Sequence, residues 1–217
     1  KVVKEAYEKY KVSADTLEKF IEKDYKLHMG HNRIHRILIE LGFSNKKGKI
    51  DVRKKKWIRY ERRHSLTAVH IDRHYDARGQ IWVFAVLDDA SRKLLALVEC
   101  MHATTEQSIY GMKLAMQHGK IKQCISDHGT QFIKQERMKS TFKDFLDENK
   151  IKQILCRIKH PQSNGKVEKF FDLYQNKRHL FKTKEEFVNW YNEVRPHRSL
   201  NFEILETPQQ AFIRKMK

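Results

Sequence analysis

Three acidic residues of this strongly basic chain stand where a fold could bring their carboxylates together. Asp72 lies in the apolar run "VHIDRHY", Asp127 follows the short run "CIS", and Glu168 comes one turn into an expected helix after "SNG". Neighbouring carboxylates repel one another, and burial without a partner raises their pKa values. A hard divalent cation that prefers oxygen ligands removes this problem. The three acids therefore predict a site for Mg²⁺ or Mn²⁺.

The residues beside these acids suit a phosphate-bearing partner. Gly129 and Gly165 leave room for the close approach of a backbone or a DNA strand. Asn164, Lys166 and Lys169 surround a helix N-terminus, where donors and positive potential favour a phosphate. Taken alone, an Asp at a strand end is commonly a turn former, and a Glu between lysines is commonly solvated. The prediction depends on the three acids occurring together.

The elements that must position the acids form an α/β pattern. Three β-rich runs, "LTAVHIDRHY", "QIWVFAVLD" and "KLLALVECM", are separated by the turns "DARG" and "DASR", which is typical of an antiparallel meander. A helix over 104–118, a strand "KQCIS", a helix over 140–149 and a strand "KQILCR" follow. Helices are expected over 166–177 and 184–193. We predict a mixed five-stranded sheet flanked by helices, with a crossover between its last two strands.

This arrangement of strands and helices would bring the three acids close together. If the first and fourth strands are neighbours, Asp72 and Asp127 lie side by side, and Glu168 faces them from its helix. Asp88 and Asp89, just before "ASR", are expected to cap a turn.

Residues 1–43 read as helical, with two apolar stripes joined by a turn at Met29-Gly30. This favours a helix-turn-helix unit whose Arg33 and Arg36 could meet DNA. The alternative is a small helical hairpin with a solvated basic face. Because the sequence begins with Lys1, we expect an initiator Met, and part of this unit, to be missing from it.

Residues 44–64 hold ten Lys or Arg, among them Lys54, Lys55 and Lys56, and two acids. Such a run repels itself and is typical of an extended linker. Trp57 and Tyr60 are interleaved with the charges, which also suits a segment that contacts a phosphate backbone.

Composition narrows the class of partner. The 217 residues carry a formal net charge of +18, which favours nucleic acid over a membrane. No apolar run approaches the roughly 20 residues that cross a bilayer, and no signal peptide is visible. The three cysteines, Cys100, Cys124 and Cys156, are widely spaced in apolar runs. We interpret them as buried free thiols, which predicts a protein of the reducing cytoplasm.

The motifs "DHGTQF", "HPQSNGKVEKFF" and "YNEVRPHRSL", in this order after an acid in the first strand, resemble the integrase core of DDE transposases. The resemblance covers about residues 65–200, and the flanking parts resemble those of prokaryotic insertion-sequence transposases. It implies a cytoplasmic, nucleoid-associated protein of a prokaryotic host. It divides the chain into a helix-turn-helix unit (1–43), a basic linker (44–64), a catalytic core (65–182) and a C-terminal helical segment (183–217).

The resemblance implies a ribonuclease-H-like fold in which Asp72, Asp127 and Glu168 are the DDE triad and bind the metal. It implies hydrolysis at the ends of an element, followed by attack of the freed 3′-hydroxyl on target DNA. Two ends of double-stranded DNA must be handled together, so a homo-oligomer on DNA is expected. Many relatives carry a basic residue two turns after the glutamate, where this chain has Gln175.

Some alternatives stay open on the sequence. A transposase-derived DNA-binding protein without cleavage activity, and a nuclease that hydrolyses without strand transfer, would carry similar motifs. His160 could orient the site or only shape its loop. Arg195, His197 and Arg198 could meet DNA or pair with acids of the core.

Overall fold

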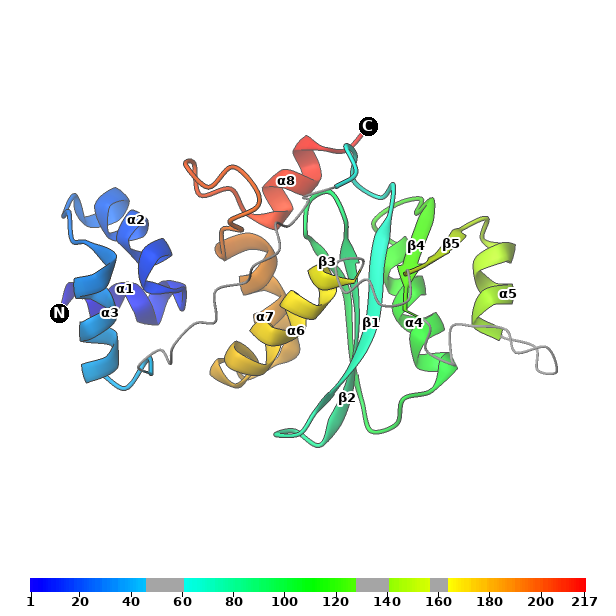
Figure 1. Ribbon diagram of the computed structural model, residues 1–217, viewed down its shortest axis with the longest axis horizontal. Coiled ribbons are helices and arrows are strands. Elements are labelled where there is room, and N and C mark those ends of the chain that lie inside the picture. The colour runs from blue at the N-terminus through cyan, green and yellow to red at the C-terminus, as the bar shows by residue number, and fades with distance from the viewer. Residues whose placement is uncertain (46–60, 128–140, 157–163) are drawn as a thin grey trace, which may run out of the picture.

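The computed structural model describes residues 1–45, 61–127, 141–156 and 164–217. A five-stranded sheet lies at the centre, with α6 and α7 along one face and α4 and α5 along the other (Figure 1). A unit of three helices at the N-terminus lies beyond α6 and α7. The predicted mixed sheet flanked by helices is thereby confirmed.

The sheet joins an antiparallel meander to two parallel strands. Its members are β1 (Val69–Asp76), β2 (Ile81–Asp88), β3 (Leu94–Cys100), β4 (Gln123–Ser126) and β5 (Lys152–Leu155). Their order is β3-β2-β1-β4-β5, with β4 parallel to both β1 and β5. Parallel neighbours need a crossover, and α5 (Thr141–Glu148) lies between β4 and β5 in the chain. The first and fourth strands are therefore neighbours, as the placement of the acids requires.

The alternation along β2 shows how the two faces are covered. Val83, Ala85 and Leu87 contribute to a core shared with α6 (Gly165–Lys177) and α7 (Lys184–Asn189). Phe84 and Val86 contribute to a second core shared with α4 (Thr105–Met116) and α5. Because both faces are buried, β2 reads as one continuous apolar run.

Gly111 lets α4 approach the sheet closely. A Cβ built at this position would lie 2.5 Å from the Phe84 ring, so a larger residue would force the two elements apart.

The C-terminal segment is attached to the edge of the sheet. After α7 the chain forms a π-helical turn over Trp190–Val194, and Asn192 within it bonds edge strand β3. Its side chain accepts from the Leu94 N–H and donates to the Leu94 carbonyl, both at 2.9 Å. The amide thus forms hydrogen bonds with an N–H and a carbonyl that would otherwise be unpaired on an edge strand. The last helix, α8 (Pro208–Arg214), places Phe212 in the second core.

The N-terminal unit consists of α1 (Val2–Tyr10), α2 (Ala14–Tyr25) and α3 (His31–Glu40). Gly42 ends α3 with φ of +74°, its N–H bonding the Ile39 carbonyl while the Phe43 N–H bonds that of Leu38. These two bonds form the Schellman pattern. Gly42 adopts the left-handed backbone conformation that this pattern requires without steric cost.

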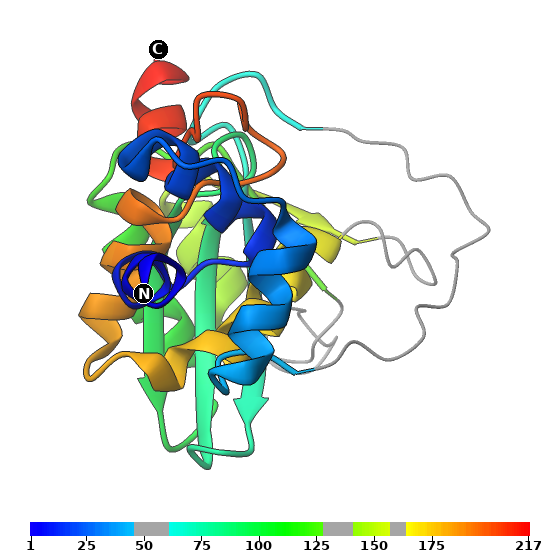
Figure 2. The ribbon, with the colours of Figure 1, turned by 90° about the vertical axis from the view of Figure 1, so that its left-hand side faces the viewer.

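This unit packs on α6 and α7, as the view from the N-terminal side shows (Figure 2). The Trp190 indole N–H donates to the Tyr10 carbonyl at 2.6 Å, and the Lys177 amine lies 2.9 Å from the Tyr7 hydroxyl. The described part of the chain contains no helix of the length and apolarity that a bilayer requires.

Candidate active site

Asp72 occupies the middle of β1, the central strand, and is half-buried. Its Oδ1 accepts from the Arg73 N–H at 2.7 Å, and its Oδ2 accepts from the Asn164 side-chain amide at 2.9 Å. Asn164 is the residue at which α6 begins, so this bond ties the start of α6 to β1.

Asp127 and Glu168 approach Asp72 from two other elements. The parallel register pairs His70 of β1 with Ile125 of β4. Asp127 directly follows β4, and the same register continued by two residues would bring it level with Asp72. Glu168 lies exposed in the first turn of α6, whose N-terminal end is bound to Asp72 through Asn164. The structure thus brings the three predicted acids toward one region.

The charges of these acids act on one another. Burial raises the pKa of Asp72 from 3.8 to about 7, and the negative charges of Asp127 and Glu168 add to the shift. Burial and the same three acids raise the pKa of the Cys156 thiol to about 11. Cys156 directly follows β5, and its N–H donates to the Ser126 carbonyl at 2.8 Å. Four side chains from separate elements therefore share this region.

The donor chemistry here suits a divalent cation. Three carboxylates are hard oxygen ligands, and a cation would offset the repulsion that raises the pKa of Asp72. Beside them, the Asn164 Oδ1 is buried and has no hydrogen-bond partner among the residues that the structure describes. Within the described residues, however, no group of three or more His, Cys, Asp or Glu side chains lies in an arrangement that could hold a metal ion. The ligand types fit Mg²⁺ or Mn²⁺, whereas their present arrangement does not surround one point.

Comparison with known proteins agrees with this fold. Residues 62–161 match the family model described as the integrase core domain. The chain carries an integrase-like core. The catalytic core domain of BIV integrase has the same ribonuclease-H-like fold, with a TM-score of 0.53 at 14% identity, covering 68% of this chain and 94% of that one.

Two relatives match at the level of sequence. The ORF3 protein of Spiroplasma virus SpV1-C74, named as a candidate integrase, is 28% identical over 189 residues, which is 72% of this chain. The match spans 51% of that viral protein, about half of its length. An uncharacterized protein of Archaeoglobus fulgidus is 30% identical over 89 residues, covering 41% of this chain and 70% of the relative.

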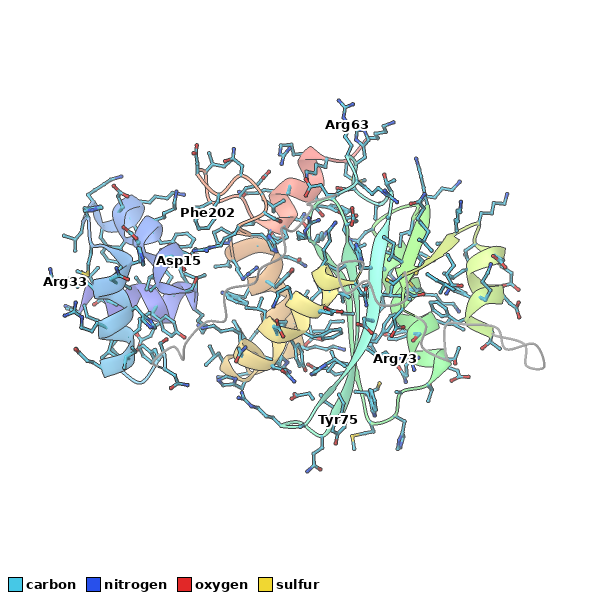
Figure 3. All side chains as sticks on the ribbon, viewed as in Figure 1. Asp15, Arg33, Arg63, Arg73, Tyr75 and Phe202 are labelled. Carbon is cyan, nitrogen blue, oxygen red and sulfur yellow. The ribbon has the colours of Figure 1, made fainter. Side chains whose placement is uncertain are left out.

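The residues predicted to contact DNA fall into three groups. Arg33 and Arg36 are exposed on α3, and Arg33 lies on the outer side of the N-terminal unit, away from the integrase-like core (Figure 3). Lys169 is exposed on α6 and pairs with Asp172 at 2.6 Å. Lys54, Lys55 and Lys56 lie outside the described residues, as do His160 and Gly129. For all of these, contact with DNA stays a prediction.

Asn164 and Lys166 have protein partners that the sequence did not indicate. Asn164 is buried and bonds Asp72, so it orients a carboxylate of the site. The Lys166 amine pairs with the buried Asp89 carboxylate, which also accepts from the Arg62 N–H at 2.5 Å. Phosphate contact by either residue would compete with these bonds and stays a prediction.

Asp89 is the centre of a buried polar network and does not cap a turn. The His70 Nε2 lies 2.7 Å from its Oδ1, and both side chains are at most 3% exposed. Burial lowers the pKa of His70, which favours a neutral ring with its proton on Nε2 toward Asp89. Although burial alone would raise it, the hydrogen bond from His70 and the charge of Lys166 hold the pKa of Asp89 well below its usual range. The network joins β1 to the first turn of α6.

The neighbouring Asp88 does cap the turn as predicted. Its Oδ2 accepts from the backbone N–H and the hydroxyl of Ser91, at 2.8 and 2.5 Å. Its Oδ1 accepts from the Leu66 N–H at 2.8 Å.

The basic residues of "YNEVRPHRSL" have separate surroundings. Arg195 is half-buried against Tyr191, 5.5 Å from its ring centroid, and burial of its guanidinium lowers the pKa of that group. Arg198 forms an ion pair with Asp15 of α2. His197 accepts from the Ser199 N–H at 3.2 Å. Arg198 thus joins the C-terminal segment to the N-terminal unit, and no acid of the sheet pairs with it among the described residues.

Sequence reasoning missed Cys156 as a neighbour of the acids, and it treated all three thiols as buried. Cys124 is buried, whereas Cys100 and Cys156 are half-buried, and all three are free. The placement of Cys156 directly after β5, parallel to β4, was the available signal, since such strand ends meet at one edge.

Proposed function

We propose that this chain is a DNA transposase or integrase that cleaves the ends of an element and joins the freed 3′-hydroxyl to target DNA. Asp72, Asp127 and Glu168 are its catalytic residues in this proposal. The observation that carries it is the arrangement of the three acids: Asn164 ties the first turn of α6, which bears Glu168, to Asp72, and Asp127 directly follows β4, the parallel neighbour of β1. Three acids from separate elements converge within an integrase-like core, in a chain of charge +18.

The three carboxylates would hold Mg²⁺ or Mn²⁺. When bound, such ions activate the attacking oxygen and stabilise the leaving oxygen of a phosphoryl transfer. The chain's own groups orient the site: the Asn164 amide holds one oxygen of Asp72, and Asp89 holds Lys166 in the first turn of α6. No side-chain base is required.

Double-stranded DNA is the proposed partner, at element ends and at the target. The exposed Arg33 and Arg36 of α3 and the basic run 44–64 are the proposed contacts for element ends. Joining two ends to one target requires two sites held together, so we propose a homo-oligomer on DNA.

The test replaces Glu168 by Gln, which keeps the shape of the side chain and removes its charge. End-labelled duplexes taken from DNA flanking the gene are incubated with Mg²⁺ or Mn²⁺ and resolved on a denaturing gel. We expect nicking at one defined position by the wild type and a loss of at least about 10³-fold in the variant, because a metal ligand is removed. Longer joined products would demonstrate strand transfer.

Asp172→Asn is the matched control, because it removes an exposed acid one turn further along the same helix. It should cut as the wild type does, and both variants should retain binding to the duplex. Undiminished cutting by Glu168→Gln would show that the triad assignment is wrong. A retarded complex that neither protein cuts would favour a DNA-binding protein without cleavage activity.

A further inference from the structure

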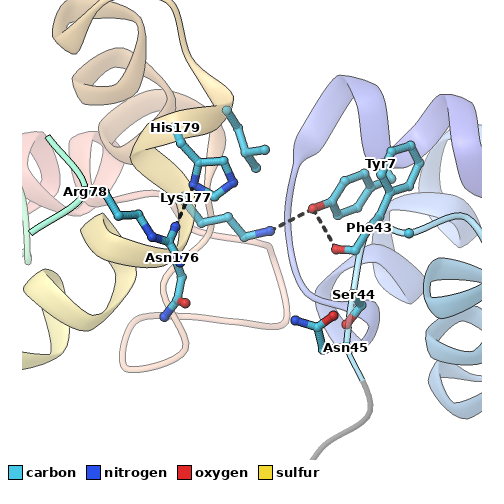
Figure 4. A pocket seen from close by; sticks show the side chains of 10 residues that line it. Tyr7, Phe43, Ser44, Asn45, Arg78, Asn176, Lys177 and His179 are labelled. Carbon is cyan, nitrogen blue, oxygen red and sulfur yellow. Dashed lines mark hydrogen bonds between the residues drawn. The ribbon is translucent and has the colours of Figure 1, made fainter.

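A hollow of about 420 Å³ lies where the N-terminal unit meets the integrase-like core (Figure 4). Tyr7, Phe43 and Asn45 line it from the N-terminal unit. Arg78, from the turn between β1 and β2, and Lys177 and His179, at the end of α6 and just beyond it, line it from the core. Segments far apart in the sequence thus form one concave surface.

The charge of this hollow is uncompensated by its own lining. Arg78 and Lys177 are cations, and none of the ten lining residues is acidic. A smaller hollow beside α5 differs, because Asp147 there forms an ion pair with Lys143. Cations converging in a concave surface without an acid raise the local concentration of an anion.

The two cations are held in place by neutral groups. The Arg78 Nη1 donates to the Gln175 carbonyl at 3.0 Å and lies 3.4 Å from the His179 Nδ1. Its Nε and Nη2 have no hydrogen-bond partner among the described residues. The Lys177 amine donates to the Tyr7 hydroxyl at 2.9 Å and lies 5.0 Å from the centroid of that ring. Both charges are therefore oriented without being neutralised.

We propose that this hollow binds a backbone phosphate of DNA, with Arg78 as the principal contact. The planar guanidinium keeps two nitrogens for phosphate oxygens, and the amides of Asn45 and Asn176 line the same space. The identity of the anion rests on the proposed function, since a duplex lying at the acids would bring its phosphates along α6.

Helix α6 sets the distance between the two places. Glu168 and Gln175 are seven residues apart on it, which at 1.5 Å per residue is roughly 10 Å. This is about three base-pair steps at 3.4 Å each. For a duplex that runs along α6, the hollow would hold a phosphate about three base pairs from the reacting one. Residues of both the N-terminal unit and the core would contact this phosphate in the hollow.

The experiment measures binding of the whole chain to a fluorescein-labelled 20-base-pair duplex in EDTA, over a series of salt concentrations. Arg78 is exposed in a turn, so Arg78→Gln should leave the fold intact, as circular dichroism can verify. We expect the slope of log K against log salt to fall in magnitude by about 1. Affinity at 0.1 M salt should fall roughly fivefold to tenfold.

Two variants make the result specific. Arg78→Lys, which keeps the charge, should retain the wild-type slope. Lys113→Gln removes an exposed cation from α4, on the opposite side of the sheet, and should also leave the slope unchanged. An equal loss in Lys113→Gln would overturn the proposal, because the effect would then reflect net charge.

A wild-type slope in Arg78→Gln would likewise overturn it. If the wild type cuts DNA in that case, the proposed function stands and only the hollow is misassigned. A wild type that binds no duplex at all would contradict both proposals.

Discussion

The Asp72 carboxylate is half-buried on β1, and its pKa of about 7 reflects burial together with the charges of Asp127 and Glu168. In the unfolded chain an Asp titrates near 4, so the folded state binds the proton more tightly. Below about pH 4 the Asp72 carboxyl is protonated in both states and does not lower the free energy of unfolding. The cost grows as the pH rises from there and is complete above about pH 7.

Asp72→Asn should therefore stabilise the metal-free protein at pH 8 and change it little at pH 4.5. Each unit of pKa corresponds to about 1.4 kcal/mol, and partial exposure reduces the total, so we expect a gain of about 1–3 kcal/mol at pH 8. Thermal unfolding in EDTA at the two pH values measures it. Asp172→Asn controls for the loss of one negative charge from a basic chain. A gain of the same size at both pH values would contradict this explanation.

The position of α6 depends on polar bonds at its first turn. Asn164 bonds Asp72 of β1, and Lys166 bonds Asp89, which in turn contacts His70 of β1. The apolar face of the helix, with Val167, Phe170 and Tyr174, holds α6 on the sheet but does not specify its position along the strand. These polar bonds supply that specification and thereby locate Glu168.

Asp89→Asn should destabilise the protein by about 3 kcal/mol, because the Lys166 amine is left without its counter-charge in a largely buried position. Denaturation in urea measures the loss. Adding Lys166→Met should recover part of it, since both members of the pair are then absent. Losses that simply add in the double variant would show that the two groups do not stabilise each other.

The N-terminal unit and the integrase-like core share one apolar cluster, and polar bonds between described residues also join them. One of these bonds joins the Trp190 indole to the Tyr10 carbonyl, and another is the ion pair of Arg198 with Asp15. A DNA duplex that contacts both α3 and the acids must accommodate this arrangement. On the proposed function, the docking of the unit would therefore affect which DNA the whole molecule can bind.

Trp190→Phe should loosen this docking, because the ring is largely kept while the bond to Tyr10 is lost. Loss of a hydrogen bond worth about 1 kcal/mol should make amide exchange in α1–α3 roughly fivefold faster. Exchange in β1–β3 should stay unchanged. Hydrogen exchange with mass spectrometry measures both regions. Trp82→Phe, on β2, is the matched control and should leave α1–α3 as they are. Equal exchange in the two variants would show that the bond does not hold the unit.

Local patterns in the sequence determined the elements. Each signal involves residues only a few positions apart: the apolar run "QIWVFAVLD", the glycine at position 42 and the apolar stripes of the helices. The elements could therefore be predicted from the sequence. The three acids were also readable, because their glycine and asparagine neighbours mark strand ends and a helix start. With the resemblance to an integrase core, this sufficed to predict the sheet and its crossover.

The tertiary structure alone decided which side chains meet. Only the pairing of β1 with β4 brings Asp127 near Asp72, and only the packing of α6 directs Asn164 to that carboxylate and Lys166 to Asp89. Lys166 and Asp89 are 77 residues apart, and nothing in the periodicity of either segment names its partner. Periodicity determines which face of an element is buried, whereas the partner of a polar group depends on how the elements pack.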